Sequence, residues 1–457
     1  MAKPFHRRDF FVLRRLMDDP LVTVVYGPRQ VGKTTLLYQL VRHLIEERQV
    51  DPQRVVFFSF DHLLGVGGEE DLIPRIIDAY VTSVLGSEIT RRGDQTYFFF
   101  DEVARLEGWS AALKGYVDQK YRIKFIVSDS SQSLILSGLA KDLVGRNDAR
   151  LVLPLKFSDF ISYRLRNDGI SKAMLDFRET LKRAFLRGSA SQVTRCLREV
   201  EAYLAPFDRR VRSELNRYLL VDGFPGLLDV TDYKEASRSL RHYVELTLYR
   251  DVVRVFEVRN PKTLEELAGY IADNSSARMN YQNMAQTLKI RNETLKDYLD
   301  YLESVFLVVS SEYYSKSRAK RLRRPRKLYF RDCGLRNAIT GSLDRSLLAD
   351  SARLGPVVET VVADHALRLQ FHLTGESKIR YWQDSADREV DMVLEAGRRA
   401  LAIECKYRRT IDSADLRAVG GFLEENPGAV ALVVTRDVLE RRGNLVLVPL
   451  HVFLMCC

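Results

Sequence analysis

One phosphate-binding pattern near the N-terminus constrains the fold of this 457-residue chain more than any other feature. Residues 27–34 read GPRQVGKT, which fits G-x-x-x-x-G-K-[ST], and they lie between the apolar run 21–26 and an amphipathic segment. The pattern binds phosphate where a buried strand ends and a helix begins, because loop N–H groups and the positive helix end then face the same anion. It therefore predicts a nucleotide-binding α/β domain built on a parallel sheet.

The loop residues have separate predicted roles in holding ATP and Mg²⁺. Gly27 and Gly32 permit the backbone to curl around phosphate oxygens. Lys33 reaches the β- and γ-phosphates, and the Thr34 hydroxyl holds Mg²⁺. The predicted nucleotide-binding residues are Gly27, Pro28, Arg29, Gln30, Val31, Gly32, Lys33, Thr34 and Thr35.

Continuous apolar runs predict the strands of this sheet. They lie at 21–26, 55–60, 96–100, 123–127 and 151–153, and runs without polar alternation are typical of strands buried on both faces. The run 96–100 leads directly into Asp101 and Glu102. We expect Asp101 to bind Mg²⁺ through water and Glu102 to orient the attacking water as a catalytic base.

Two further polar residues follow the fourth run. Ser130 comes just after a strand end, where its side chain is predicted to sense the γ-phosphate. Arg146 lies beyond it, and we interpret it either as a residue that reaches the γ-phosphate of a neighbouring subunit or as a surface residue. The first alternative would make the protein a homo-oligomer.

These motifs together resemble those of a known group of proteins. The resemblance rests on residues 27–35, on Asp101-Glu102 followed by residues 106–109, on PLKFS at 154–158 and on GFP at 223–225. They look like the AAA-type P-loop ATPases of archaea and bacteria that carry a C-terminal restriction-endonuclease-like (PD-(D/E)XK) domain. The family usually has Gln where this chain has Ala104, and often Gly where it has Asp129. The resemblance implies an ATPase with a nuclease-like C-terminal domain.

The pattern along the chain predicts a multidomain α/β protein in four parts. Residues 1–158 form the ATPase domain, 159–260 a helical connector broken at 222–226, 261–330 a winged-helix-like module and 331–457 the nuclease-like domain. Three helices are expected near 263–274, 280–288 and 292–304. Asn260-Pro261 and a capping box from Thr263 to Glu266 mark the start of the first. Strands are expected at 306–310 and 327–330, which is the order of elements in a winged helix.

The loop between these two strands is strongly basic. Residues 316–327 read KSRAKRLRRPRK and supply +8 of the formal net charge of +10, so the other 445 residues carry only +2. A charge this concentrated indicates a nucleic-acid partner, DNA above all, bound mainly through phosphates. The alternatives are a solvated loop or a winged helix that binds protein. The predicted nucleic-acid-binding residues are Arg291, Lys296, Lys316, Arg318, Lys320, Arg321, Arg323, Arg324, Arg326 and Lys327.

A hairpin in the C-terminal part is predicted to bring acidic residues together. With Gly397 and Arg398 at the turn, Asp391 stands opposite Glu404, and Lys406 follows on the same face. Like charges placed opposite each other destabilise a sheet, and a Mg²⁺ ion between them would reverse that penalty. These three residues fit the D…E-x-K catalytic pattern of the nuclease-like fold, and Glu359 on the preceding helix fits the further metal-binding acid.

Two functions remain open at this point. The chain is predicted to be an ATP-hydrolysing protein that acts on DNA, with a Mg²⁺-dependent nuclease-like domain. The alternative is a nucleotide-switched regulatory ATPase that binds DNA or protein and whose nuclease-like domain does not cut. No apolar run approaches the ~18 residues that span a membrane, and the five cysteines lack zinc-site or disulfide spacing, so we expect a cytoplasmic protein.

Overall fold

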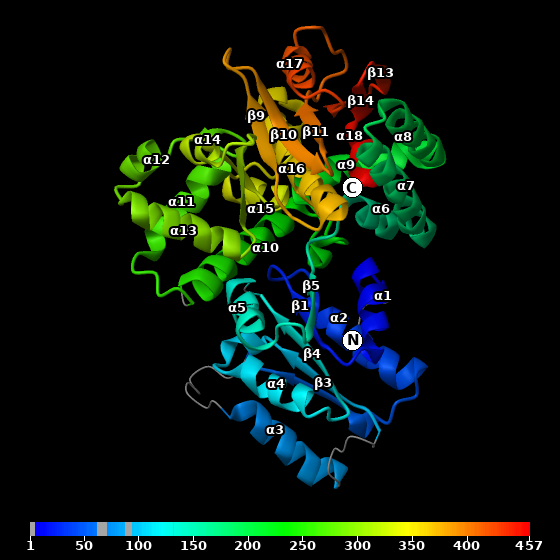
Figure 1. The fold of residues 1–457 in the computed structure, drawn as a ribbon, viewed down its shortest axis with the longest axis vertical. Helices are drawn as coiled ribbons and strands as arrows, with labels where there is room; N and C mark the ends of the chain where they lie inside the picture. The colour runs from blue at the N-terminus through cyan, green and yellow to red at the C-terminus, as the bar shows by residue number, and fades with distance from the viewer. Residues whose placement is uncertain (1–4, 62–70, 87–93, 131, 254) are drawn as a thin grey trace. The chain divides into compact units, whose positions relative to one another are not determined.

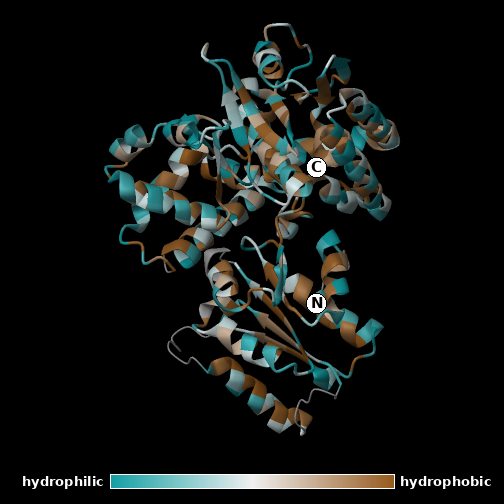
Figure 2. Cartoon of the chain, viewed as in Figure 1, coloured by the Kyte–Doolittle hydropathy of each residue, from teal (hydrophilic) through white to brown (hydrophobic). Residues whose placement is uncertain are grey.

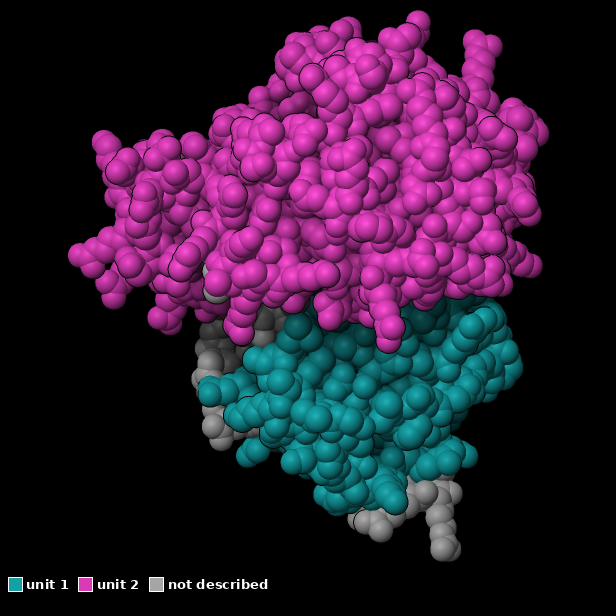
Figure 3. Space-filling model, turned by 45° about the horizontal axis from the view of Figure 1, so that its top comes forward, with its two compact units in different colours: residues 1–153, 304–306 teal, residues 154–303, 307–457 magenta. Residues whose placement is uncertain are grey.

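The chain divides into two compact units, which are described separately. The computed structural model describes residues 5–61, 71–86, 94–130, 132–253 and 255–457 (Figure 1). Figure 3 colours the first unit, residues 1–153 with 304–306, and the second unit, residues 154–303 with 307–457. None of the helices in the described ranges is both long and apolar enough to cross a membrane.

The first unit contains the predicted parallel sheet. Its five strands run in the order β2-β3-β4-β1-β5, and every neighbouring pair is parallel. The strands are β1 (Val22–Tyr26), β2 (Val55–Ser59), β3 (Thr96–Asp101), β4 (Ile123–Asp129) and β5 (Asn147–Leu151). The described helices are α1 (Arg8–Arg15), α2 (Lys33–Arg42), α3 (Leu72–Tyr80), α4 (Trp109–Asp118) and α5 (Gln132–Asp142).

The core of this unit lies where the sequence is continuously apolar. All six residues of β3 and all seven of β4 are buried, and Phe98, Phe100 and Phe125 pack in one cluster. Figure 2 shows the same gathering of hydrophobic residues in the strands. The three interior strands β3, β4 and β1 could be predicted from the sequence because they are continuously apolar.

The strand predicted at 151–153 is displaced in the structure. β5 covers Asn147–Leu151, whose residues are mostly half-buried, and Val152 and Leu153 lie beyond its end. β5 pairs only with β1 at the edge of the sheet. An edge strand need not be apolar on both faces, so the apolar signal begins only where this strand ends.

The second unit begins with a helical region, as predicted. Its helices are α6 (Phe157–Leu165), α7 (Asp168–Arg187), α8 (Ala190–Leu204), α9 (Asp208–Val221), α10 (Tyr233–Leu246), α11 (Pro261–Asp273), α12 (Tyr281–Thr287), α13 (Asn292–Ser304), α14 (Arg318–Arg323), α15 (Cys333–Ile339), α16 (Ser351–Thr374), α17 (Arg417–Glu425) and α18 (Leu450–Cys456). The expected helices near 263–274, 280–288 and 292–304 are α11, α12 and α13.

The predicted capping box at the start of α11 is wrong. The helix begins at Pro261, and its N-cap is Asn260, whose side-chain oxygen accepts a hydrogen bond from the N–H of Thr263 at 3.3 Å. Thr263 therefore already lies inside the helix. The start signal predicted at Asn260-Pro261 is confirmed, because Asn caps well and Pro is tolerated at the first helical position.

A nine-stranded mixed sheet forms the centre of the second unit. In spatial order its strands are β13 (Glu440–Arg442), β14 (Leu445–Pro449), β12 (Val430–Thr435), β11 (Arg399–Cys405), β10 (Glu389–Ala396), β9 (Arg380–Gln383), β7 (Val308–Tyr313), β8 (Arg326–Phe330) and β6 (Arg278–Met279). Glu312 and Tyr313 of β7 pair with Arg380 and Tyr381 of β9. This pairing joins the predicted winged-helix-like module and the C-terminal strands in one sheet.

Residues 316–327, predicted as a basic loop, contain a short helix. Residues Arg318–Arg323 form the short helix α14, and the Ser317 hydroxyl accepts a hydrogen bond from the N–H of Lys320 at 3.4 Å. Arg, Ala, Lys and Leu are all good helix formers, so local propensity explains this turn of helix. The strands β7 and β8 on either side pair antiparallel, as expected.

Two motifs of the sequence meet at the break between α9 and α10. Leu155, in the segment 154–158, donates its backbone N–H to the Gly223 carbonyl at 2.7 Å and accepts a hydrogen bond from the Tyr218 hydroxyl at 2.9 Å. A Cβ placed at Gly223 would lie 1.9 Å from the Leu155 carbonyl oxygen. The backbones approach so closely that only glycine fits here.

We expect Gly223→Ala to lower the free energy of unfolding of the second unit by about 1–3 kcal/mol, because the added methyl group forces two backbone segments apart. Denaturant unfolding followed by circular dichroism would measure this change. Gly269→Ala in α11 is the control, since nothing lies within 4 Å of its added Cβ. That variant should gain about 0.5–1 kcal/mol from helix propensity, and equal effects in the two variants would contradict the close-approach explanation.

Candidate functional site

The phosphate-binding loop has the geometry that its sequence predicts. It follows the end of β1, and α2 begins at Lys33 with Gly32 as N-cap at a φ of 91°. The Lys33 side chain is buried and its Nζ donates to the carbonyl oxygens of Gly27 at 2.9 Å and Pro28 at 3.0 Å. Residues 27–35 therefore bring a lysine side chain and a helix N-terminus together in a compact loop at the end of β1.

Gly27 owes its identity to a close backbone approach. Its φ is 150°, and a Cβ at this position would lie 1.9 Å from the carbonyl oxygen of Val152. The N–H of Val152 also donates to the Tyr26 carbonyl at 2.7 Å. The segment that follows β5 thus supports the start of the loop and leaves no room for a side chain.

The acidic pair lies at the same edge of the sheet as the loop. Asp101 ends β3 and its Oδ2 accepts a hydrogen bond from the Thr34 hydroxyl at 2.7 Å. Asp101 also accepts a hydrogen bond from Ser128. Burial raises the pKa of Asp101, although the hydrogen bonds from Ser128 and Thr34 oppose the rise. The two predicted Mg²⁺ residues of this site are therefore in contact, and a hydroxyl with a carboxylate is a donor set that fits Mg²⁺.

The remaining predicted residues of this unit fall into two groups. Glu102 follows Asp101 with a φ of 57°, and its Oε2 accepts a hydrogen bond from the Ser130 hydroxyl at 3.1 Å, so the predicted base and sensor are linked. Arg146 instead precedes β5, at the edge where the parallel strands begin. Its Nε lies 2.5 Å from Asp118 Oδ1. The role of Arg146 in a neighbouring subunit stays a prediction.

The predicted hairpin register in the second unit is confirmed. β10 and β11 pair antiparallel with Met392 opposite Ile403 and Ala396 opposite Arg399, which places Asp391 opposite Glu404. The backbone N–H of Asp391 donates to Glu404 Oε2 at 3.2 Å, and the N–H of Cys405 donates to Asp391 Oδ2 at 2.9 Å. The Lys406 Nζ lies 2.5 Å from Glu404 Oε1. The predicted Asp, Glu and Lys are therefore side by side.

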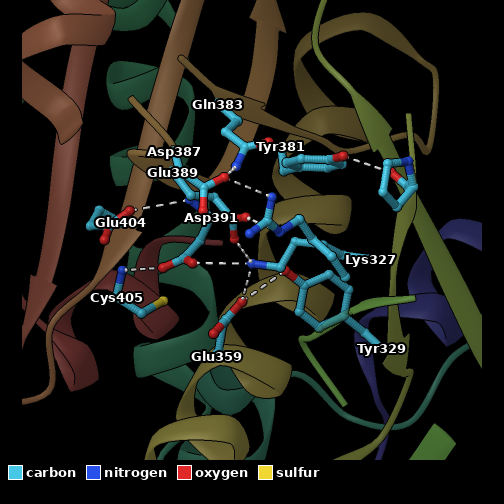
Figure 4. A network of polar contacts seen from close by, with 12 residues as sticks. Lys327, Tyr329, Glu359, Tyr381, Gln383, Asp387, Glu389, Asp391, Glu404 and Cys405 are labelled. Atoms are coloured by element: carbon cyan, nitrogen blue, oxygen red, sulfur yellow. Dashed lines mark hydrogen bonds and ion pairs between the residues drawn. The ribbon is translucent and has the colours of Figure 1, made fainter. Parts of the chain in front are cut away.

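Lys327 is where the prediction for the basic segment is wrong. We expected this residue to contact nucleic acid, but its side chain is only 2% exposed. Its Nζ lies 2.8 Å from Glu359 Oε1, 2.8 Å from Glu389 Oε1 and 3.2 Å from Asp391 Oδ1 (Figure 4). The lysine reaches these carboxylates from β8, because strand alternation turns Lys327 and Tyr329 to one face.

Further side chains complete the acidic cluster of Glu359, Glu389, Asp391 and Glu404. Tyr329 donates its hydroxyl to Glu359 Oε1 at 2.9 Å, and Arg278 Nε lies 3.1 Å from Glu389 Oε2. Glu389 and Arg278 were not predicted as site residues. Glu389 shares a strand face with Asp391, two residues along, which is the one sequence signal that points to it.

The acidic cluster shifts the pKa values of its own members. Burial and the charge of Asp391 raise the pKa of Glu404 from 4.5 to about 8 and that of Glu359 to about 7. Burial alone would lower the pKa of Lys327, but Tyr329 and the surrounding carboxylates raise it well above its ordinary value. Lys327 is therefore charged, and its ammonium partly compensates the buried acids.

The acidic cluster does not fit a divalent cation as it stands. A Mg²⁺ ion needs carboxylate oxygens at about 2.0–2.1 Å, and Lys327 already occupies oxygens of Glu359 and Asp391. Among the residues with described positions, no group of three or more His, Cys, Asp or Glu side chains is arranged to hold a metal ion. Two of the three predicted Mg²⁺ ligands, Glu359 and Asp391, contact the Lys327 ammonium, and the third, Glu404, contacts Lys406.

The other basic residues do face solvent. Lys316, Arg318, Lys320, Arg323 and Arg324 are exposed, whereas Arg321 and Arg326 are half-buried. Arg326 lies 3.5 Å from Glu312, and the Arg321 guanidinium donates to the Ser315 carbonyl at 3.2 Å. We call the seven residues Lys316, Arg318, Lys320, Arg321, Arg323, Arg324 and Arg326 the basic segment.

The helix predicted near 292–304 turns its basic residues to solvent and its leucines inward. On α13 and just before it, Lys296 and Arg291 are exposed, while Leu295, Leu299 and Leu302 are buried. A hollow of about 550 Å³ lies between α12 and the start of α13, with Gln282 and Arg291 in its lining. The polar face of this helix is therefore accessible.

We expect Glu404→Gln to flatten the pH dependence of stability. The folded protein keeps protons on Glu359 and Glu404 that the unfolded chain releases above pH 4.5, so its stability falls as pH rises to about 8. Each group accounts for up to about 1.4 kcal/mol per pH unit within its window. Urea unfolding at several pH values would test this, with Glu424→Gln on the exposed face of α17 as control. Parallel curves for wild type and Glu404→Gln would contradict the protonated cluster.

Comparisons with known protein families give a described function for the N-terminal part of the chain only. A family model described as an AAA domain matches residues 19–161. Two models described as domains of unknown function match residues 212–346 and 354–453. The AAA match covers the loop, the acidic pair and the whole parallel sheet.

Similar full-length proteins and structures add little about function. Two uncharacterised proteins of Methanocaldococcus jannaschii are 22% identical over 292 residues and 24% identical over 367 residues. These alignments cover 63% and 78% of this chain, and 55% and 71% of the two relatives, so the chain spans about half the length of the first. The branch migration motor RuvB of Thermotoga maritima is 14% identical, with 67% of this chain and 90% of that chain covered, at a TM-score of only 0.26. What the family match and the sheet establish is that the N-terminal unit is a P-loop ATPase domain of AAA type.

Proposed function

We propose that this protein hydrolyses ATP and binds DNA, and that its nucleotide state changes how it engages DNA. The observation that carries the DNA part is the basic segment, five of whose seven residues are exposed, in the unit that also contains the accessible helix α13. The ATP part rests on the loop, the acidic pair and the AAA match of the first unit.

The residues of the first unit divide the work of hydrolysis among them. The N-terminus of α2 and the Lys33 ammonium would bind the phosphates, since both present positive charge at the loop. Thr34 and Asp101 would hold Mg²⁺, which when bound neutralises charge on the phosphates. Glu102 would accept a proton from the attacking water, and the hydroxyl of Ser130, which donates to it at 3.1 Å, would position its carboxylate.

The DNA-binding part has the element order of a winged helix. Helix α11 is followed by β6, α12, α13 and the β7–β8 hairpin, and β6 pairs antiparallel with β8. In that fold one helix approaches the major groove while the hairpin lies along the phosphates. The hairpin here carries the basic segment, in which α14 takes the place of an extended wing.

Phosphate contacts would dominate over base readout in such a complex. α13 offers Arg291 and Lys296, but the exposed Glu293 and Asp297 lie on the same helix and would repel the DNA backbone. The basic segment contains no acidic residue. Binding is therefore expected to be salt-dependent and weakly sequence-specific.

The nuclease-like C-terminal domain either cleaves DNA or does not, and the geometry favours the second hypothesis. The Asp391, Glu404 and Lys406 side chains have the arrangement of a nuclease-like site, but the Lys327 ammonium lies among the carboxylates that cutting would require for a metal. We therefore propose that the protein hydrolyses ATP and binds DNA without cleaving it.

We expect Glu102→Gln to lower the rate of ATP hydrolysis by about 10²–10⁴-fold while ATP still binds, because the amide cannot accept the proton of the attacking water. Phosphate release and fluorescent-nucleotide titration would measure rate and affinity separately. Glu107→Gln, at an exposed position six residues from Asp101, is the matched control and should leave both unchanged. Undiminished hydrolysis by Glu102→Gln would remove this residue from the mechanism.

Replacing Arg318, Lys320, Arg323 and Arg324 together by Ala should weaken duplex DNA binding. The slope of log affinity against log salt should fall by about 0.9 for each phosphate contact that is lost. Fluorescence anisotropy at several salt concentrations would provide both values. The control replaces four exposed arginines of α8 and α9, Arg195, Arg198, Arg209 and Arg210, and removes the same charge. If both quadruple variants lose affinity equally, the basic segment is not the DNA site, and unchanged binding in both points to a protein partner.

A further inference from the structure

The ammonium of Lys327 is held in an unusually complete set of charge-assisted contacts. An ammonium group has three N–H donors, and the three nearest carboxylate oxygens belong to three different residues at 2.8, 2.8 and 3.2 Å. Figure 4 shows the side chain pointing from β8 toward Glu359 and Asp391. With 2% of the side chain exposed, the charge is buried but fully paired.

These contacts come from separate parts of the second unit. Glu359 belongs to α16, Glu389 and Asp391 belong to β10, and Lys327 belongs to the hairpin that carries the basic segment. The lysine therefore ties the β7–β8 hairpin to the C-terminal elements, in addition to the backbone pairing of β7 with β9.

Two of the residues that hold Lys327 are also residues that were expected to bind a divalent cation. Glu359 and Asp391 were expected to bind Mg²⁺, and each gives an oxygen to Lys327 instead. The third expected ligand, Glu404, is engaged by Lys406 at 2.5 Å and by the Asp391 N–H at 3.2 Å. The positive charge of the Lys327 ammonium would repel a divalent cation bound to the same carboxylates.

We propose that Lys327 is the resident cation of the acidic cluster, taking the place of a divalent metal and clamping the basic hairpin to the C-terminal sheet. The cluster is then an ion-pair clamp rather than a metal centre. This inference does not depend on the ATPase or on DNA binding, since it concerns only contacts inside the second unit.

The clamp predicts that removing one amine creates a metal site. In Lys327→Met the acids lose their cation while the stem of the side chain keeps its bulk, so the full-length variant should unfold at a lower temperature than wild type. Mn²⁺ alone, without nucleotide, is the probe. We expect Mn²⁺ to raise the melting temperature of Lys327→Met saturably and to bind it at least tenfold more tightly than wild type, measured by calorimetric titration.

Two matched variants separate the cluster from other effects. Lys327→Met/Asp391→Asn should lose the Mn²⁺ response, because a shared ligand is gone. Lys234→Met removes an exposed lysine of α10, outside the basic segment and the acidic cluster, and should leave the melting temperature and the Mn²⁺ response as in wild type. A folded Lys327→Met that ignores Mn²⁺ would overturn the proposal, because the lysine would then not stand in for a metal.

The wild-type protein decides the question even if Lys327→Met does not fold. Saturable Mn²⁺ binding by nucleotide-free wild type that disappears in Asp391→Asn would overturn the clamp, since the cluster would then hold a metal with the lysine present. Absence of such binding supports it. Lys327→Arg adds a second readout, because it keeps the charge and should fold without Mn²⁺ and leave it unbound.

Discussion

The buried ammonium of Lys327 constrains more of the second unit than any other single group. Removing a charge from water costs several kcal/mol, and leaving it without a partner costs about 3–5 kcal/mol. The three carboxylates must therefore stay within reach, which fixes β8 relative to α16 and β10. A one-residue slip of β8 would turn the lysine to the opposite face. Since β8 also pairs with β6 and β7, the placement of the basic segment follows from the same contacts.

In the first unit the equivalent constraint is the close backbone approach at the phosphate-binding loop. Gly27 is held against Val152, and Asp101 contacts Thr34, so the loop, the edge strand and β3 are fixed around one point. Parallel strands end at the same edge of a sheet, which brings Glu102 and Ser130 to that point as well. The site is thus a consequence of strand direction, and few long-range side-chain contacts are needed to build it.

The features that could be predicted from the sequence are those fixed by residues close together in the chain. The register of β10 and β11 follows from a two-residue turn, so the pairing of Asp391 with Glu404 could be derived from residue numbers alone. The interior strands of the first unit are apolar on both faces and were found for that reason. The pairing of β7 with β9 joins residues nearly 70 positions apart through only four paired residues, and β6 has two residues. The β7–β9 pairing and the two-residue strand β6 are too short to produce a periodic pattern of apolar residues. The continuous nine-stranded sheet was therefore not predicted.

The charge of the basic segment shows why composition alone misassigns residues. Eight basic residues in twelve read as one cationic surface, yet five are exposed, two are half-buried and Lys327 is inside the protein. The difference is set by secondary structure: Lys327 is the second residue of a strand, where the period of two decides which side chains turn inward. A charge run therefore has to be divided by the elements that it crosses before its members are given one role. Here that division separates a surface suited to a polyanion from an internal cation that holds the same hairpin in place.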